Sequence, residues 1–82
     1  MSQRAKLIAA VRNNPNDVRF DDACKIARWL GFVHEGRGKG PHRAFSRTGE
    51  ATLLNFQNRG GRIPRYQADQ LIEMIDKYES EL

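Results

Sequence analysis

One segment, from Gly36 to Arg47, holds the residues whose types and spacing best suit chemistry on a phosphate group. Glycines occupy every second position from 36 to 40, Arg37 and Lys39 alternate with them, and His42 and Arg43 follow. Glycine lets a backbone approach a ligand closely, and guanidinium and ammonium groups make charge-assisted hydrogen bonds to phosphate oxygens. The segment predicts a phosphate-binding turn with a titratable imidazole at its edge. The alternative is a solvated hairpin whose charges only keep it in solution.

RNA is a polyanion that such a segment could both bind and cleave. The 2′-hydroxyl of RNA can attack the neighbouring phosphate once it is deprotonated, and a histidine with an ordinary pKa of roughly 6.5 accepts or donates a proton near neutrality. A cation beside it stabilises the charge that develops on the phosphate. His42 is therefore the candidate catalytic residue, with no metal or other cofactor required. His34, in a predicted strand, is interpreted as structural or surface-exposed.

The charge of the chain is unevenly distributed. The net charge is +4, but residues 35–65 contain seven basic and two acidic side chains, whereas residues 66–82 contain one basic and five acidic ones. Concentration of positive charge in one segment favours an anionic partner, with nucleic acid first. The predicted phosphate ligands are Arg37, Lys39, Gly40, Arg43, Arg47, Arg59 and Arg62.

Length and cysteine content exclude several classes of protein. A chain of 82 residues allows one domain. Its apolar runs are too short to cross a bilayer and it has no signal-peptide pattern, so we expect a cytoplasmic protein with no membrane partner. Cys24 is the only cysteine, which excludes an internal disulfide and, with two histidines, a four-ligand zinc site. No P-loop, dinucleotide-binding fingerprint or carboxylate cluster is present.

Apolar spacing and turn-forming residues predict three helices and three strands. The helices are expected over 2–13, 20–30 and 65–79, and the strands over 32–35, 42–47 and 51–56. Ser2 is placed to cap the first helix, and Gly31 to end the second. The predicted class is α+β, in the order α-α-β-β-β-α, with a three-stranded antiparallel sheet packed on helices. Ala44 is expected on the inner face of the sheet. Trp29 and Tyr66 are expected in the core, with a place in a groove as the alternative.

An ordered set of short motifs resembles the HicA family, the small ribonuclease toxins of two-gene toxin–antitoxin modules. The motifs are Asn14-Pro15, Val18-Arg19-Phe20-Asp21, Gly31-Phe32, Gly40-x-His42-Arg43, Leu54-Asn55-Phe56-Gln57, Gly60-Gly61, Tyr66-Gln67, Gln70-Leu71 and Ile75-x-x-Tyr78. They run from about residue 14 to the last residue, so residues 1–13 would be an N-terminal helix added to a 14–82 core.

The resemblance implies a fold similar to double-stranded RNA-binding domains and an activity as a metal-independent endoribonuclease that cleaves mRNA. It implies that His42 is catalytic and that a HicB-type antitoxin silences the protein by covering the active site. Pro41 stands where the family has a serine, so a hydroxyl and a backbone N–H donor are missing. That change either removes a phosphate contact or preorganises the backbone ahead of His42, and the sequence leaves both open.

A different class of function uses the same residues. A double-stranded-RNA-type module could grip the RNA backbone without cutting it, through the basic hairpin and the loop from Arg59 to Arg65. A DNA-binding subunit is the weaker interpretation, because no predicted helix is basic along its outer face. The sequence does not give the RNA preference or the oligomeric state.

Overall fold

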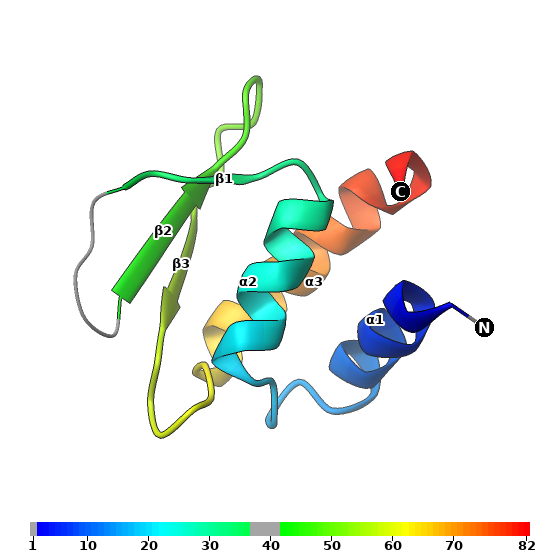
Figure 1. The fold of residues 1–82 in the computed structure, drawn as a ribbon, viewed down its shortest axis with the longest axis vertical. Helices are drawn as coiled ribbons and strands as arrows, with labels where there is room; N and C mark the ends of the chain where they lie inside the picture. Colours follow the sequence, from blue (N-terminus) through cyan, green and yellow to red (C-terminus); the bar gives the residue numbers. More distant parts are fainter. Residues whose placement is uncertain (1, 37–41) are drawn as a thin grey trace.

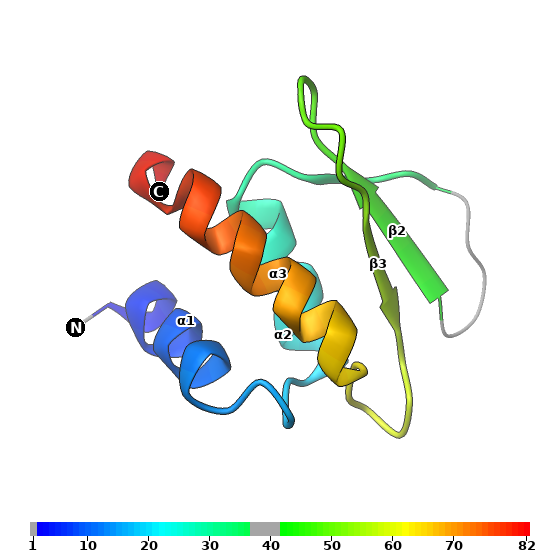
Figure 2. The ribbon, with the colours of Figure 1, turned by 180° about the vertical axis from the view of Figure 1, so that it is seen from behind.

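The computed structural model describes residues 2–36 and 42–82 and confirms the predicted α+β class and order of elements. The elements are α1 (Gln3–Asn13), α2 (Phe20–Trp29), β1 (Val33–His34), β2 (His42–Ser46), β3 (Leu54–Gln57), α3 (Arg65–Tyr78) and a 3-10 turn, η1 (Glu79–Glu81). Helices α2 and α3 lie side by side on one face of the sheet, and α1 lies beyond them, away from the strands (Figure 1). The view from behind shows the same arrangement of layers (Figure 2).

The sheet is an antiparallel meander in the order β1-β2-β3. Its register places His42 opposite Gln57, Ala44 opposite Asn55 and Phe45 opposite Leu54. Side chains alternate between the faces of a strand, and Phe45 and Leu54 are completely buried against the helices. His42, Ala44, Asn55 and Gln57 therefore share the opposite face, which we call the outer face.

Two predictions about individual residues were wrong. Ala44 was expected on the inner face, but Phe45 takes that place, because its larger ring fills the space between sheet and helices and sets the phase of the strand. Tyr66 was expected in the core and is 60 % exposed at the start of α3, where Gln67 and Ala68 turn inward instead.

The third strand is shorter than predicted, and Glu50 provides the reason. Its carboxylate accepts a hydrogen bond from the backbone N–H of Thr52, at 2.9 Å. The Thr52 N–H is thus used within the turn, and ladder pairing with β2 begins only at Leu54.

The ends of two helices follow their predicted signals. The Ser2 hydroxyl accepts a hydrogen bond from the N–H of Ala5 at 3.1 Å and caps α1. At the end of α2, Gly31 has φ +87°, its N–H donates to the carbonyl of Arg28, and the N–H of Phe32 donates to that of Ala27. This pair of bonds is a Schellman motif, which turns the chain from α2 into β1 and buries Phe32.

The core is formed by one apolar cluster between the sheet and the helices. Cys24 belongs to it as a small apolar residue, 2 % exposed, and burial raises the pKa of its thiol. Trp29 is only partly buried and packs against the edge of this cluster. No helix within residues 2–36 and 42–82 is long and apolar enough to span a membrane.

A cluster of polar side chains, here called the distal cluster, joins the far end of β2 to the end of α3. The Arg47 guanidinium donates to the carbonyl of Leu30 at 2.6 Å and to Glu81 at 2.8 Å, and lies 3.6 Å from the centre of the Tyr78 ring. Glu50 accepts hydrogen bonds from the Tyr78 hydroxyl and from Lys77. These bonds hold the pKa of the Glu50 carboxyl down to about 2, with Lys77 as the largest cause.

Candidate nucleic-acid interface

His42 lies at the start of β2, on the outer face of the sheet, with its side chain exposed. None of the helices in the described part of the chain covers this face (Figures 1 and 2). The cross-strand partner of His42 is Gln57, and the next pair on the outer face is Ala44 with Asn55. An imidazole on an open surface is accessible to a large ligand, and the side-chain amide of Gln57 beside it can donate and accept hydrogen bonds.

Arg43, the residue after His42, points to the other side of the sheet. Its guanidinium carbon lies 5.3 Å from the centre of the Phe20 ring, at the start of α2, and the residue is partly buried. Consecutive strand residues face opposite ways, so His42 and Arg43 cannot contact one phosphate from the same face. Arg43 instead places its charge at the N-terminal end of α2.

The end of the molecule that carries His42 also gathers three arginines, here called the arginine cluster: Arg19, Arg59 and Arg62. Two isolated β-bridges, Arg19 with Arg62 and Arg59 with Arg62, bring their backbones together. In the first bridge the Phe20 N–H donates to the carbonyl of Gly61 and the Ile63 N–H to that of Val18; in the second, Arg59 and Arg62 each donate an N–H to the other's carbonyl. The loop after β3 is thus fastened to the chain that enters α2.

Two helix N-termini add to the positive potential at this end. Helices α2 and α3 both begin beside the arginine cluster, and neither has a side chain that caps its first turn. Uncapped N-terminal N–H groups carry partial positive charge and bind anions. Acidic groups offset part of this charge: Asp21 and Asp22 lie in the first turn of α2, Asp17 pairs with Arg62, and Asp69 pairs with Arg65 at 2.9 Å. Arg19 and Arg59 form no ion pair with any side chain of residues 2–36 and 42–82.

Gln67 connects the start of α3 to the strand beside His42. Its side-chain oxygen accepts the backbone N–H of Gln57 at 2.7 Å, and the residue is 5 % exposed. Tyr66, next to it, keeps its ring in solvent, and its hydroxyl oxygen lies 3.3 Å from the Gln67 amide nitrogen. An exposed aromatic ring at the same end as His42 offers a flat surface on which a base can stack.

The predicted phosphate ligands are therefore only partly brought together. Arg59 and Arg62 lie at the end of the molecule that carries His42, whereas Arg47 lies five strand positions away, in the distal cluster. Arg37, Lys39, Gly40 and Pro41 lie outside the described residues. Arg19 and Tyr66 were not predicted as site residues, and only the Val18-Arg19-Phe20-Asp21 and Tyr66-Gln67 motifs of the resemblance marked them.

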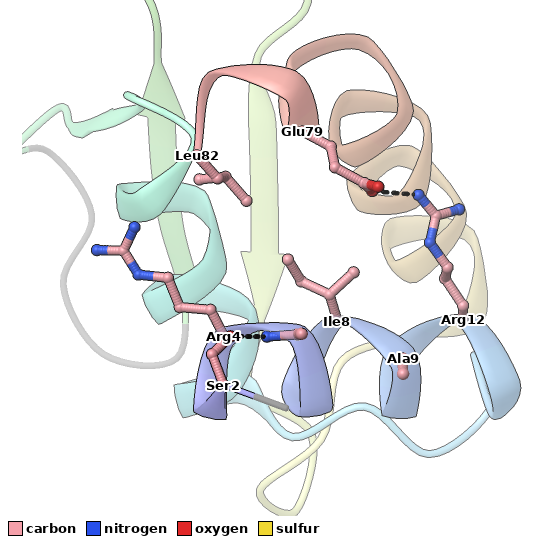
Figure 3. Close-up of a pocket in the computed structure, with 8 residues that line it drawn as sticks. Ser2, Arg4, Ile8, Ala9, Arg12, Glu79 and Leu82 are labelled. Carbon is pink, nitrogen blue, oxygen red and sulfur yellow. Dashed lines mark hydrogen bonds and ion pairs between the residues drawn. The ribbon is translucent and has the colours of Figure 1, made fainter.

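A separate groove of about 410 Å³ lies between α1 and the C-terminal turn, away from the strands (Figure 3). Ile8 and Leu82 face each other across it, and the ion pair from Arg12 to Glu79, at 2.6 Å, closes one side. Among the residues with described positions, no group of three or more His, Cys, Asp or Glu side chains is arranged to hold a metal ion.

Comparison with known proteins found no matching family model, no matching curated protein and no matching solved structure.

Proposed function

We propose that this protein is an RNA-cleaving toxin of the HicA type, with His42 as its general acid or base. The observation that carries the proposal is the position of His42. Its imidazole stands exposed on an uncovered sheet face, at the end of the molecule where the arginine cluster and two helix N-termini gather positive charge. That charge attracts the phosphate backbone, and the histidine supplies the proton transfer that cleavage of RNA requires.

The reaction would use the 2′-hydroxyl of the substrate as the nucleophile. Its oxygen forms a bond to the adjacent phosphorus while the bond from phosphorus to the 5′-oxygen of the next nucleotide breaks, leaving a 2′,3′-cyclic phosphate and a free 5′-hydroxyl. His42 either takes the proton from the 2′-hydroxyl, with water protonating the departing 5′-oxygen, or gives a proton to that oxygen while water takes the one from the 2′-hydroxyl. Arg19 and Arg59 would hold flanking phosphates, and the exposed ring of Tyr66 would stack on a neighbouring base.

The test uses a labelled RNA, the wild-type protein and His42→Ala, each with and without EDTA. The wild-type protein should cut the RNA in both buffers, and His42→Ala should leave it intact while keeping the wild-type melting temperature, because the side chain it removes is exposed. His34→Ala is the matched control. His34 is also exposed, but it lies on β1 with its ring 5.5 Å from that of Phe45, so its loss should leave cutting unchanged. Undiminished cutting by His42→Ala would overturn the assignment.

One observation favours a second function, an RNA-binding module that does not cut. Within the described part of the sheet, the outer-face neighbours of His42 are Ala44, Ser46, Asn55, Gln57 and Val33, none of which is an acid or a base near neutrality. A binding module would hold RNA with a steep salt dependence, keep its affinity in His42→Ala, and return the RNA intact.

The resemblance also supports a protein partner. A HicB-type antitoxin would cover the outer face and exclude RNA, and its gene should lie directly beside the gene for this chain. Co-expression of that neighbour should relieve the growth arrest caused by the wild-type protein. Growth arrest that persists while the two proteins copurify would contradict inhibition by covering the site.

A further inference from the structure

A second groove, of about 350 Å³, runs between α1 and α2 on the part of the molecule that the outer face does not use. Its floor is apolar and contains Leu7, Ala10 and Trp29, and its rims carry the ammonium groups of Lys6 on α1 and Lys25 on α2. Asp22 is the one acidic residue that lines it. An apolar floor between two cations matches the chemistry of a nucleotide, which has a flat base and an anionic phosphate.

Further cations extend the groove on both sides. Arg4 also lines the C-terminal groove (Figure 3), and its guanidinium carbon lies 5.2 Å from the centre of the Trp29 ring. Arg28 reaches the opposite way, with its guanidinium carbon 5.8 Å from the centre of the Phe45 ring in β2. Arg4, Lys6, Lys25 and Arg28 form no ion pair with any side chain in the described ranges, unlike Arg12, whose partners are Asp76 and Glu79.

Helix α1 is not needed to cover the sheet, because α2 and α3 already do so. It packs against these helices through Ile8 and Val11. Its remaining surface carries Arg4 and Lys6 and no acidic residue from Gln3 to Asn13. Besides the cover that Ile8 and Val11 give the core, a helix with this charge supplies a surface for an anion.

We infer that α1 and α2 form a second contact for single-stranded RNA, in which Lys6 and Lys25 bind phosphates and Trp29 contacts a base. The inference rests on the proposed function for the identity of the polymer. Arg28 lies between this groove and β2, so a strand bound here can continue toward the sheet, whose opposite face carries His42. The groove thereby lengthens the RNA footprint of a small protein.

The chain offers a direct readout, since Trp29 is its only tryptophan. Binding of an unlabelled single-stranded RNA to His42→Ala protein, which removes the candidate catalytic group, should quench Trp29 fluorescence. Lys6→Gln with Lys25→Gln should weaken binding about 25-fold at 0.1 M salt and reduce the salt slope by about 1.4, since each single-strand phosphate contact contributes about 0.7 to that slope. Lys6→Arg with Lys25→Arg is the matched control and should retain both affinity and quenching.

The inference would be wrong if RNA left Trp29 fluorescence unchanged, or if it bound the glutamine and arginine variants equally. The inference would also be wrong if the glutamine variant kept its full affinity for RNA but no longer bound a protein partner. That result would assign the groove to the protein partner. A different result is expected if the proposed nuclease function is wrong. The wild-type protein would then leave RNA intact, but RNA would still quench Trp29 fluorescence, and the glutamine variant would still bind RNA more weakly.

Discussion

Arg47, which directly follows β2, was predicted to bind RNA, but its contacts indicate that it stabilises the fold instead. Replacing it tests which of these roles it has. Its side chain is 21 % exposed and all of its contacts lie in the distal cluster. The hydrogen bond from its guanidinium to the Leu30 carbonyl is charge-assisted and contributes about 1.5–3 kcal/mol. Stacking on the Tyr78 ring contributes about 0.5–2 kcal/mol. The bond to Glu81, which is 57 % exposed, contributes about 0–1 kcal/mol.

These three contributions share one guanidinium and do not add in full, so replacement of Arg47 by alanine should lower the free energy of unfolding by about 2–4 kcal/mol. In a domain of this size each kcal/mol lowers the melting temperature by about 4–8 °C, so we expect a fall of roughly 10–25 °C. RNA affinity, measured at a temperature where both proteins are folded, should stay within about twofold of wild type. Glu81→Gln is the control and should cost less than about 1 kcal/mol, because it removes only the exposed contact.

Thermal unfolding followed by circular dichroism and fluorescence anisotropy with a labelled RNA provide the two readouts for Arg47→Ala. An unchanged melting temperature together with RNA affinity reduced tenfold or more would refute the reasoning. It would show that Arg47 leaves the distal cluster to bind RNA, as the sequence alone had suggested.

Three further predictions concern the fold. Gly31→Ala should cost about 1–2 kcal/mol in thermal unfolding, because φ is +87° there; an unchanged melting temperature would contradict the Schellman geometry. The pKa of Glu50 is about 2 in the folded protein, below its ordinary value of 4.5, so its bonds to Lys77 and Tyr78 stabilise the fold above pH 4.5. That stability should be lost as the pH falls from 4.5 towards 2, and Glu50→Gln should flatten urea-unfolding curves across this window; an unaltered pH profile would exclude the proposed bonds. The Cys24 thiol should react with a disulfide reagent roughly 1,000-fold or more slowly in the native protein than in urea; equal rates would show that the core is open.

The sequence predicted the order of elements well because the signals for it are local. Ser2, Gly31 and the 3.6-residue spacing of apolar residues in α2 act within one or two helical turns. The class of the fold followed from these signals. The face of each strand was harder to predict, since β2 alternates only weakly in polarity. Only packing against the helices selects Phe45 rather than Ala44 for the inner side.

The candidate site could be predicted only in part, because long-range contacts assemble it. His42 was singled out from its local neighbours, and its side chain is exposed on the outer face; its catalytic role stays a prediction. The pairing of Arg19 with Arg62 joins residues from the two ends of the domain, and no local pattern marks it. Arg43 and Arg47 both count as basic residues in the sequence, yet one packs on Phe20 and the other belongs to the distal cluster. The sequence shows that a residue is basic, but not whether its side chain is already paired with another group of the protein.

The chemistry at His42 is tested most directly by one comparison of substrates. Wild-type protein is incubated with a labelled RNA strand and with the same strand carrying 2′-O-methyl groups throughout, and His42→Ala is run beside it. We expect the RNA to be cut to fragments ending in a 2′,3′-cyclic phosphate, the methylated strand to be bound but left intact, and the variant to cut neither. Cutting of the methylated strand, or equal cutting of RNA by His42→Ala, would contradict a histidine-assisted attack by the 2′-hydroxyl.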